Sequence, residues 1–209
     1  DDGRLRSFAA SLKARTISYS MQDSRVAVHL AGPIEFDGKT SVFPVSLEGK
    51  QVVMRASILG VHQVQNALAA AALAHGMGYL AETIVEGLSR YRSVHQRMEL
   101  RQLENGNILV DDTYNANPMS MLAAVRATIE ASRKKPVIAV LGEMRELGPE
   151  SRDLHHEVGR QIGGLGITRL ITLGELAAAI QEGAQEAGMA KSACHHAQDH
   201  EEIVTLLKT

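Results

Sequence analysis

Short apolar runs separated by turn residues make up the first half of the chain. They predict four strands, at residues 16–19, 26–30, 40–45 and 51–55. The step Asp37-Gly38 lies between two alternating segments, and both residue types tolerate a positive φ, so a β-hairpin is expected there. An Ala-rich segment with apolar residues in helical spacing then predicts a helix from Val64 to His75, and a second follows at 81–88.

Strands and helices alternate from Met98 onward. The runs 98–103 and 108–111 flank Asn105-Gly106, which predicts an antiparallel hairpin. The continuous apolar run 136–141 is typical of a strand in the middle of a sheet, covered by helices on both faces. The same pattern predicts a helix from Pro118, helices carrying Leu154, Val158 and Ile162 and then Leu176, Ile180 and Ala184, strands at 169–173 and 193–197, and a last helix begun by Asp199 and Glu202.

The change in pattern predicts a domain boundary after Ser93. Residues 1–93 are expected to form an antiparallel ribbon with helices, and residues 94–209 an α/β domain with a mostly parallel sheet. The fold class is therefore α/β in two parts.

Composition narrows the range of functions. Lys and Arg number 22 against 24 Asp and Glu, a net charge of -2 that gives no electrostatic reason to bind nucleic acid or an anionic membrane. Four Tyr, three Phe and no Trp are too few for a base-stacking platform. The single cysteine, Cys194, forms no internal disulfide, and neither a signal peptide nor a long apolar run is evident, so a cytoplasmic location is expected.

Two polar loops follow predicted strands, where parallel sheets bind their ligands. In 111–118 (DDTYNANP), carboxylates suit ribose hydroxyls or a hydrated metal and amides suit peptide or phosphate, although Asn117 alone also fits a helix cap. In 142–148 (GEMRELG), Glu143 and Glu146 suit a metal or an ammonium group, or are simply solvated.

Two other signals are discounted. The segment 32–40 (GPIEFDGKT) has five residues between its glycines and continues as a strand, so Gly38-Lys39 is interpreted as a hairpin turn and no phosphate-binding P-loop is present. The residues around Cys194 have a metal-like composition, but His195 and His196 are adjacent in a predicted strand and point to opposite faces.

Three segments resemble the Mur ligase family. They are 60–71 (GVHQVQNALAAA), 111–118 (DDTYNANP) and 141–148 (LGEMRELG), and the last two are similar to the branch that adds D-alanyl-D-alanine. The chain departs from the family pattern at Gln63, where Asn is usual, and at Gln96, where Gly is usual.

The resemblance implies that residues 1–93 are the second part of the ATP-binding central domain and residues 94–209 most of a Rossmann-like C-terminal domain. It implies an ATP-dependent ligase that joins D-alanyl-D-alanine to UDP-N-acetylmuramoyl-tripeptide through an acyl phosphate, in peptidoglycan synthesis. The family's P-loop, magnesium-binding glutamate and modified lysine do not occur here, and its last strand is not evident. A fragment that is inactive alone is therefore expected, with Mg²⁺ held mainly by the absent part. A noncatalytic nucleotide- or peptide-binding module is the alternative.

The resemblance also implies roles for particular residues, but no catalytic residue or metal ligand in this chain. ATP contacts are implied for Asn66 on the adenine side, Arg97 at the phosphates, Asp112 at the ribose, and Tyr114. Tyr114, Asn115 and Asn117 are implied to line a cleft between domains, and Glu143, Glu146 and His155 the dipeptide side or the closure interface. The oligomeric state is left open.

Overall fold

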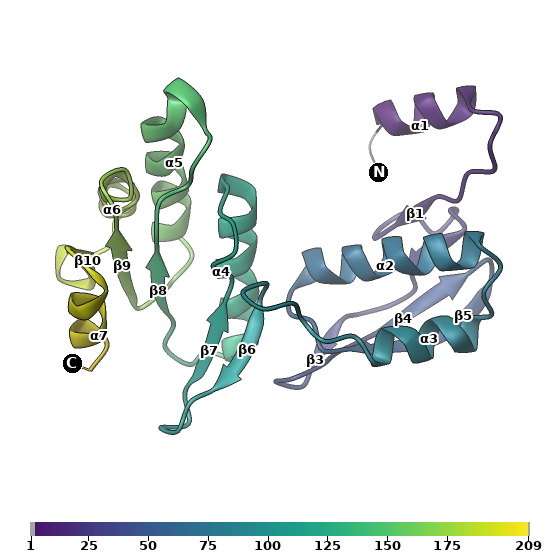
Figure 1. Ribbon diagram of the computed structural model, residues 1–209, viewed down its shortest axis with the longest axis horizontal. Helices are drawn as coiled ribbons and strands as arrows, with labels where there is room; N and C mark the ends of the chain where they lie inside the picture. Colours follow the sequence, from purple (N-terminus) through teal and green to yellow (C-terminus); the bar gives the residue numbers. More distant parts are fainter. Residues whose placement is uncertain (1–2, 209) are drawn as a thin grey trace. The chain divides into compact units, whose positions relative to one another are not determined.

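A computed structural model describes residues 3–208, and its helices and strands fall into two units divided between Val94 and His95 (Figure 1). The elements of the first unit are α1 (Gly3–Ser11), β1 (Tyr19–Ser20), β2 (Val28–Leu30), β3 (Glu35–Phe36), β4 (Ser41–Leu47), β5 (Lys50–Ala56), α2 (Val61–Gly76) and α3 (Ala81–Ser89).

The first unit is a small mixed sheet packed against α2 and α3. β4 is the central strand: β2 and β3 pair with it antiparallel, and β5 pairs with it antiparallel from Ser41 opposite Ala56 to Leu47 opposite Lys50. The expected ribbon is therefore confirmed for these strands, whereas β1 pairs with β2 in parallel. Phe43 of β4 and Met54 of β5 are fully buried in one core with Leu68 of α2. The side chains that α2 contributes to this core are small or medium in size.

The hairpin expected at Asp37-Gly38 is confirmed. Asp37 Oδ1 accepts hydrogen bonds from the backbone N–H groups of Lys39 and Thr40, at 2.9 and 2.8 Å, and β4 follows directly. A P-loop requires a helix directly after its lysine. Lys39 instead lies in a turn between two strands, so this segment is not a P-loop.

The second unit contains two sheets. Its elements are β6 (Glu99–Gln102), β7 (Ile108–Asp111), α4 (Pro118–Ser132), β8 (Ile138–Leu141), the 3-10 helix η1 (Gly148–Glu150), α5 (Ser151–Gly163), β9 (Arg169–Leu173), α6 (Ala178–Glu186), the 3-10 helix η2 (Lys191–Ala193), β10 (Cys194–Ala197) and α7 (His200–Lys208). β6 and β7 form the expected antiparallel hairpin, and β10, β9 and β8 form a parallel sheet in that order.

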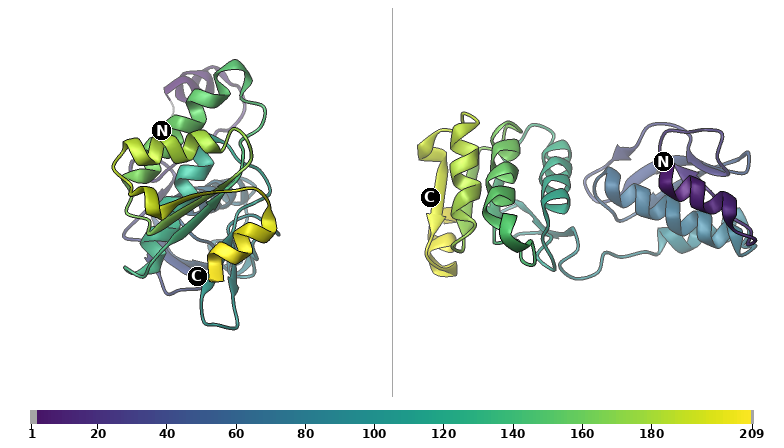
Figure 2. Two further views of the ribbon diagram at one scale, coloured as in Figure 1. Left: turned by 90° about the vertical axis from the view of Figure 1, so that its left-hand side faces the viewer. Right: turned by 90° about the horizontal axis from the view of Figure 1, so that it is seen from above.

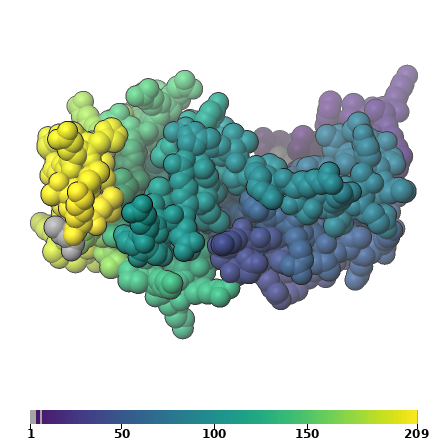
Figure 3. Space-filling view, turned by 60° about the horizontal axis from the view of Figure 1, so that its bottom comes forward, coloured from purple at the N-terminus to yellow at the C-terminus, as the bar shows by residue number. Residues whose placement is uncertain are grey.

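Helices cover the parallel sheet unequally. Helices α4, α5 and α6 lie side by side (Figure 2, right), and their core includes Leu170 of β9. On the other face Ile203 of α7, at the end of the chain drawn in yellow in Figure 3, packs against Ile171.

The expectation that 136–141 forms a covered central strand is wrong. β8 is an edge strand of the three-stranded sheet, and Ile138 and Val140 are each 43% exposed. α7 packs over β9 and β10, whereas among the described residues no helix covers this face of β8. The middle strand is β9, in which Leu170 and Ile171 are fully buried.

Helix starts follow the sequence closely. Asn117 caps α4: its side chain accepts a hydrogen bond from the backbone N–H of Ser120, and Ser120 Oγ accepts from the backbone N–H of Asn117. Asp199 Oδ1 accepts from the backbone N–H of Glu202 at 2.8 Å, as expected for the last helix. Leu176, by contrast, lies in the turn before α6 and not in the helix.

Candidate functional site

The entry to β6 and the exit from β7 are bound to each other. The backbone N–H of Met98 donates to Asp112 Oδ1 at 3.0 Å, and the backbone N–H of Tyr114 donates to the carbonyl of Gln96 at 3.1 Å. These two bonds join residues 95–98 to residues 111–114, which include the start of the polar loop singled out from the sequence.

Arg97 and Tyr114 meet at this junction. The Arg97 guanidinium carbon lies 4.0 Å from the centroid of the Tyr114 ring, a cation–π contact, and the Tyr114 side chain is 62% exposed. Gln96 and Met98, on either side of Arg97, both have left-handed backbone conformations, with φ of 61° and 51°. Such conformations are costly for residues other than glycine, so the turn that presents Arg97 depends on its hydrogen bonds.

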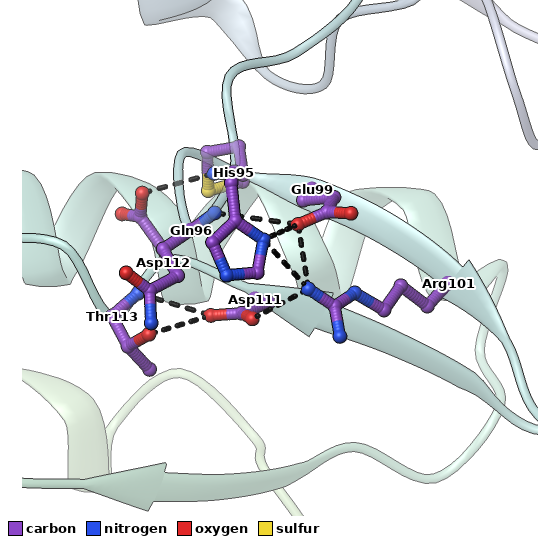
Figure 4. Close-up of polar contacts among 8 residues, drawn as sticks. His95, Gln96, Glu99, Arg101, Asp111, Asp112 and Thr113 are labelled. Carbon is purple, nitrogen blue, oxygen red and sulfur yellow. Dashed lines mark hydrogen bonds and ion pairs between the residues drawn. The ribbon is translucent and has the colours of Figure 1, made fainter.

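The two adjacent aspartates have different surroundings (Figure 4). Asp111 Oδ1 accepts from the backbone N–H and Oγ1 of Thr113, and its Oδ2 lies 3.5 Å from Arg101. Asp112 uses Oδ1 for the Met98 N–H, while its Oδ2 has no hydrogen-bond partner among the described residues. Of the two, Asp112 is therefore the one with an oxygen left to accept a ligand hydroxyl.

A charged cluster of His95, Glu99, Arg101 and Asp111 lies beside the junction (Figure 4). Glu99 stands opposite Asp111 in the hairpin register, and the guanidinium of Arg101 lies between them, 2.8 Å from Glu99 Oε2. His95 Nδ1 lies 2.9 Å from both Glu99 Oε2 and Arg101 Nη2, so the ring tautomer decides whether Nδ1 donates to Glu99 or accepts from Arg101.

The hydrogen bond from Arg101 is the main cause that lowers the pKa of Glu99 to about 2, and bonds from the Gln96 N–H and His95 act in the same direction. Because the folded pKa is below the ordinary value of 4.5, this carboxylate stabilises the fold at higher pH, and its contribution is lost as the pH falls from 4.5 towards 2. Glu99 is therefore ionised at neutral pH.

The remaining predicted residues of this loop differ in role. Asn115 is exposed, whereas Asn117 is engaged in the capping box of α4. The capping interpretation of Asn117, left open by the sequence, thus accounts for its side-chain oxygen.

The second predicted loop, after β8, is tied to the loop after β9. Glu143 Oε1 accepts a hydrogen bond from the backbone N–H of Leu176 at 2.8 Å. Gly174 has φ of +106°, and a Cβ on it would lie 2.5 Å from Cγ of Glu143, so only glycine leaves room for this contact. Glu143 therefore acts first as a link between two loops.

His155 supports the same loop from inside. Its side chain is fully buried, Nε2 accepts from the backbone N–H of Met144 at 2.8 Å, and Nδ1 lies 2.6 Å from the carbonyl of Ser151. Both ring nitrogens are thus engaged within the fold, so the His155 ring has no nitrogen left to offer to the dipeptide side or the closure interface that the resemblance implies. Glu146, with φ of 62°, is exposed on the loop that His155 holds.

The structure thus brings Arg97, Asp112 and Tyr114 together. Asn66 lies in the first unit, exposed on α2. The sequence interpretation missed Glu99 and Arg101, although the departure from glycine at Gln96 marked the turn. Within residues 3–208, no three His, Cys, Asp or Glu side chains gather as a metal-binding set, and no helix has the length and apolar character to cross a membrane.

Comparison with known families identifies the class of protein. The family model described as "Mur ligase, glutamate ligase domain" matches residues 96–209, more than half of the chain. The chain therefore belongs to the Mur ligase family.

Three curated relatives are each named UDP-N-acetylmuramoyl-tripeptide--D-alanyl-D-alanine ligase. The protein from Escherichia coli (strain K12) is 36% identical over 149 residues, 71% of this chain and 31% of its own length. That from Bacillus subtilis (strain 168) is 41% identical over 129 residues, 61% of this chain and 28% of its own. That from Mycobacterium tuberculosis (strain ATCC 25618 / H37Rv) is 34% identical over 182 residues, 83% of this chain and 35% of its own length. The chain thus spans about a third of the length of these relatives.

Solved structures agree with this assignment. A crystal structure of MurF from Acinetobacter baumannii is similar over 99% of this chain and 42% of its own, with a TM-score of 0.81 and 28% identity. MurF from Thermotoga maritima in complex with ADP is similar over 99% and 45%, with a TM-score of 0.77 and 21% identity, which shows the fold alone.

Proposed function

We propose that this chain is the C-terminal part of an ATP-dependent amide ligase that joins D-alanyl-D-alanine to UDP-N-acetylmuramoyl-tripeptide in peptidoglycan synthesis. Residues 1–93 would be the second part of the ATP-binding central domain and residues 94–209 the C-terminal domain. The single observation that carries the proposal is the junction of Arg97, Asp112 and Tyr114, found in a chain whose relatives bear that ligase name. Because ATP is consumed and the chain has one cysteine, we place the reaction in the cytoplasm.

The reaction needs a positioned nucleotide more than a covalent catalyst. ATP transfers its γ-phosphoryl group to the tripeptide carboxylate, releasing ADP, and the amine of D-alanyl-D-alanine then attacks the acyl phosphate and expels phosphate. The negative charge that spreads over the phosphoryl oxygens during transfer is stabilised by cations and by correctly oriented hydrogen-bond donors. Arg97 would supply such a cation, and Asp112 Oδ2 would accept a ribose hydroxyl.

The other predicted residues are assigned either to contact with the nucleotide or substrate or to holding the loops in place. Asn66 is assigned to the adenine side, and Tyr114, Asn115 and Glu146 are assigned to the substrate-facing surface because each is exposed. Asn117, Glu143 and His155 are assigned to holding the loops, because their polar atoms are engaged within the unit. Because residues 3–208 contain no group of three His, Cys, Asp or Glu side chains that could hold a metal ion, Mg²⁺ would be held mainly by a part of the ligase outside these residues.

The chain alone is expected to show no ligase activity, because its sequence contains no P-loop to hold the β and γ phosphates. The measurement is phosphate release with ATP, UDP-N-acetylmuramoyl-tripeptide and D-alanyl-D-alanine present. Dipeptide-dependent release by the chain alone would contradict this expectation. A reading frame contiguous with this one that encodes GxxxxGK[ST] would support the ligase, and its absence would favour a noncatalytic binding module.

Asp112→Ala is expected to weaken ATP binding about tenfold or more, since a hydrogen bond to a charged group contributes about 1.5–3 kcal/mol. Adenosine binding should weaken too, because Asp112 is assigned to the ribose that both ligands share. ATP binding should weaken at least as much, because Asp112 also accepts from the Met98 N–H in the turn that presents Arg97. Isothermal titration calorimetry on the parent and the variant measures both affinities. Glu104→Ala is the matched control, since Glu104 is an exposed acid at the tip of the same hairpin. Equal affinities for Asp112→Ala and the parent would remove Asp112 from the site.

A further inference from the structure

The turn 95–98 presents Arg97 in a conformation that its own residues disfavour. Gln96 and Met98 flank Arg97 with φ of 61° and 51°, in the left-handed region where a Cβ crowds the backbone. A pair of such residues persists only when the surroundings hold them.

Two carboxylates hold this turn from its two sides (Figure 4). Asp112 Oδ1 accepts from the backbone N–H of Met98 at 3.0 Å, and Glu99 Oε2 accepts from the backbone N–H of Gln96 at 3.3 Å. The backbone N–H groups of both left-handed residues, Gln96 and Met98, therefore donate to a carboxylate oxygen. The Gln96 carbonyl is used as well, by the Tyr114 N–H.

The Glu99 carboxylate is itself fixed. Arg101 Nη2 donates to the same Oε2 at 2.8 Å, and Asp111 Oδ2 lies 3.5 Å from the same nitrogen. Arg101 thus keeps Glu99 facing the turn and offsets the repulsion between Glu99 and Asp111, which are opposite each other in the hairpin register.

From these contacts we infer that Glu99 is a positioning residue for Arg97: it holds Gln96 in the left-handed conformation and so keeps the Arg97 guanidinium over the Tyr114 ring. This inference rests on the proposed function in one respect, that the Arg97 guanidinium is the group that meets the phosphates. Glu99 itself would touch no ligand and would act only through the turn.

The test compares Glu99→Met, which removes the acceptor at similar side-chain size, with Glu104→Met, the same change at an exposed acid of the same hairpin. ATP affinity should fall about tenfold in Glu99→Met and remain unchanged in Glu104→Met. Adenosine affinity should change less than about twofold, because only the phosphates lose a contact. This split separates Glu99 from Asp112, whose loss should weaken both ligands.

Rescue by glycine distinguishes positioning from a purely electrostatic effect. Gly adopts positive φ without the Cβ penalty, so Gln96→Gly should make the Glu99 contact less necessary. In the Gln96→Gly background, Glu99→Met should cost about threefold or less in ATP affinity, a non-additivity expected of coupled neighbours. A full tenfold loss in that background would overturn the inference.

A spectroscopic measurement needs no ligand. Protons of the Arg97 side chain over the Tyr114 ring face are shifted upfield by the ring current, and this shift should vanish in Glu99→Met and return in Gln96→Gly/Glu99→Met. If the shift persists in Glu99→Met, the inference is wrong, whatever the nucleotide does. If the parent binds neither ATP nor adenosine while the shift behaves as expected, the positioning stands and the proposed nucleotide site fails. Glu99→Gln, which keeps an oxygen acceptor, provides the milder variant if Glu99→Met does not fold.

Discussion

Gly159→Ala is expected to destabilise the second unit by about 3 kcal/mol, because the added methyl group has nowhere to go. A Cβ on Gly159 of α5 would lie 1.9 Å from the carbonyl oxygen of Ile180 in α6. Backbone cannot move aside as the end of a flexible side chain can. A Cβ on Gly183 of α6 would likewise lie 2.0 Å from the carbonyl oxygen of His156, so the two helix backbones are in direct contact at both positions.

Gly87→Ala is the matched control for this substitution. Gly87 is also a helix residue, in α3, but a Cβ there meets nothing within 4 Å. That change should stabilise the first unit by about 0.5–1 kcal/mol, since Ala has the higher helix propensity. Urea unfolding with probes in each unit measures both effects, because two units need not unfold as one. A loss below about 1 kcal/mol for Gly159→Ala would show that α5 and α6 separate easily.

The helices themselves were predictable from sequence, but their contact was not. The spacing of Leu154, Val158 and Ile162 predicts α5, and Val158 and Ile162 are buried as expected. Gly159, one residue from Val158, reads from sequence as a weak point in a helix. The need for glycine at this position becomes evident only when α6 is placed against α5, and the distance between the two helices is set by tertiary packing.

The same distinction explains the error at β8. The run 136–141 identifies a strand correctly, because β-branched apolar residues favour strands wherever they are. Local composition does not state which strands pair with it. Here β9 takes the central position, and β8 keeps Ile138 and Val140 partly exposed at an edge.

The polar loop after β7 was located from sequence because a helix needs only one cap and the segment DDTYNANP has more polar groups than capping requires. Glu99 and Arg101 were missed because their role depends on two features that appear only in three dimensions. One is the register that sets Glu99 opposite Asp111, and the other is the left-handed backbone at Gln96.

His155 is a buried residue that supports the loop after β8 from inside the unit. The loop 142–148 is held by Glu143, which reaches the Leu176 N–H, and by Met144, whose side chain is 1% exposed and whose N–H ends on His155 Nε2. The exposed Arg145 and Glu146 are therefore displayed on a loop fixed at both preceding residues. Replacement of His155 should therefore first destabilise the conformation of this loop.

His155→Leu is expected to destabilise the second unit by about 2–3 kcal/mol, because it leaves the Met144 N–H unpaired in a buried site at nearly constant side-chain volume. Hydrogen exchange at the Met144 amide is the direct measurement: the amide should be protected in the parent and exchange much faster in the variant. His156→Leu is the neighbouring control. His156 is partly exposed and pairs with the exposed Glu186, at 3.1 Å, so its replacement should cost less than about 1 kcal/mol. If the two leucine variants were equally stable, or if the Met144 amide stayed protected in His155→Leu, the ring would not be what holds the loop.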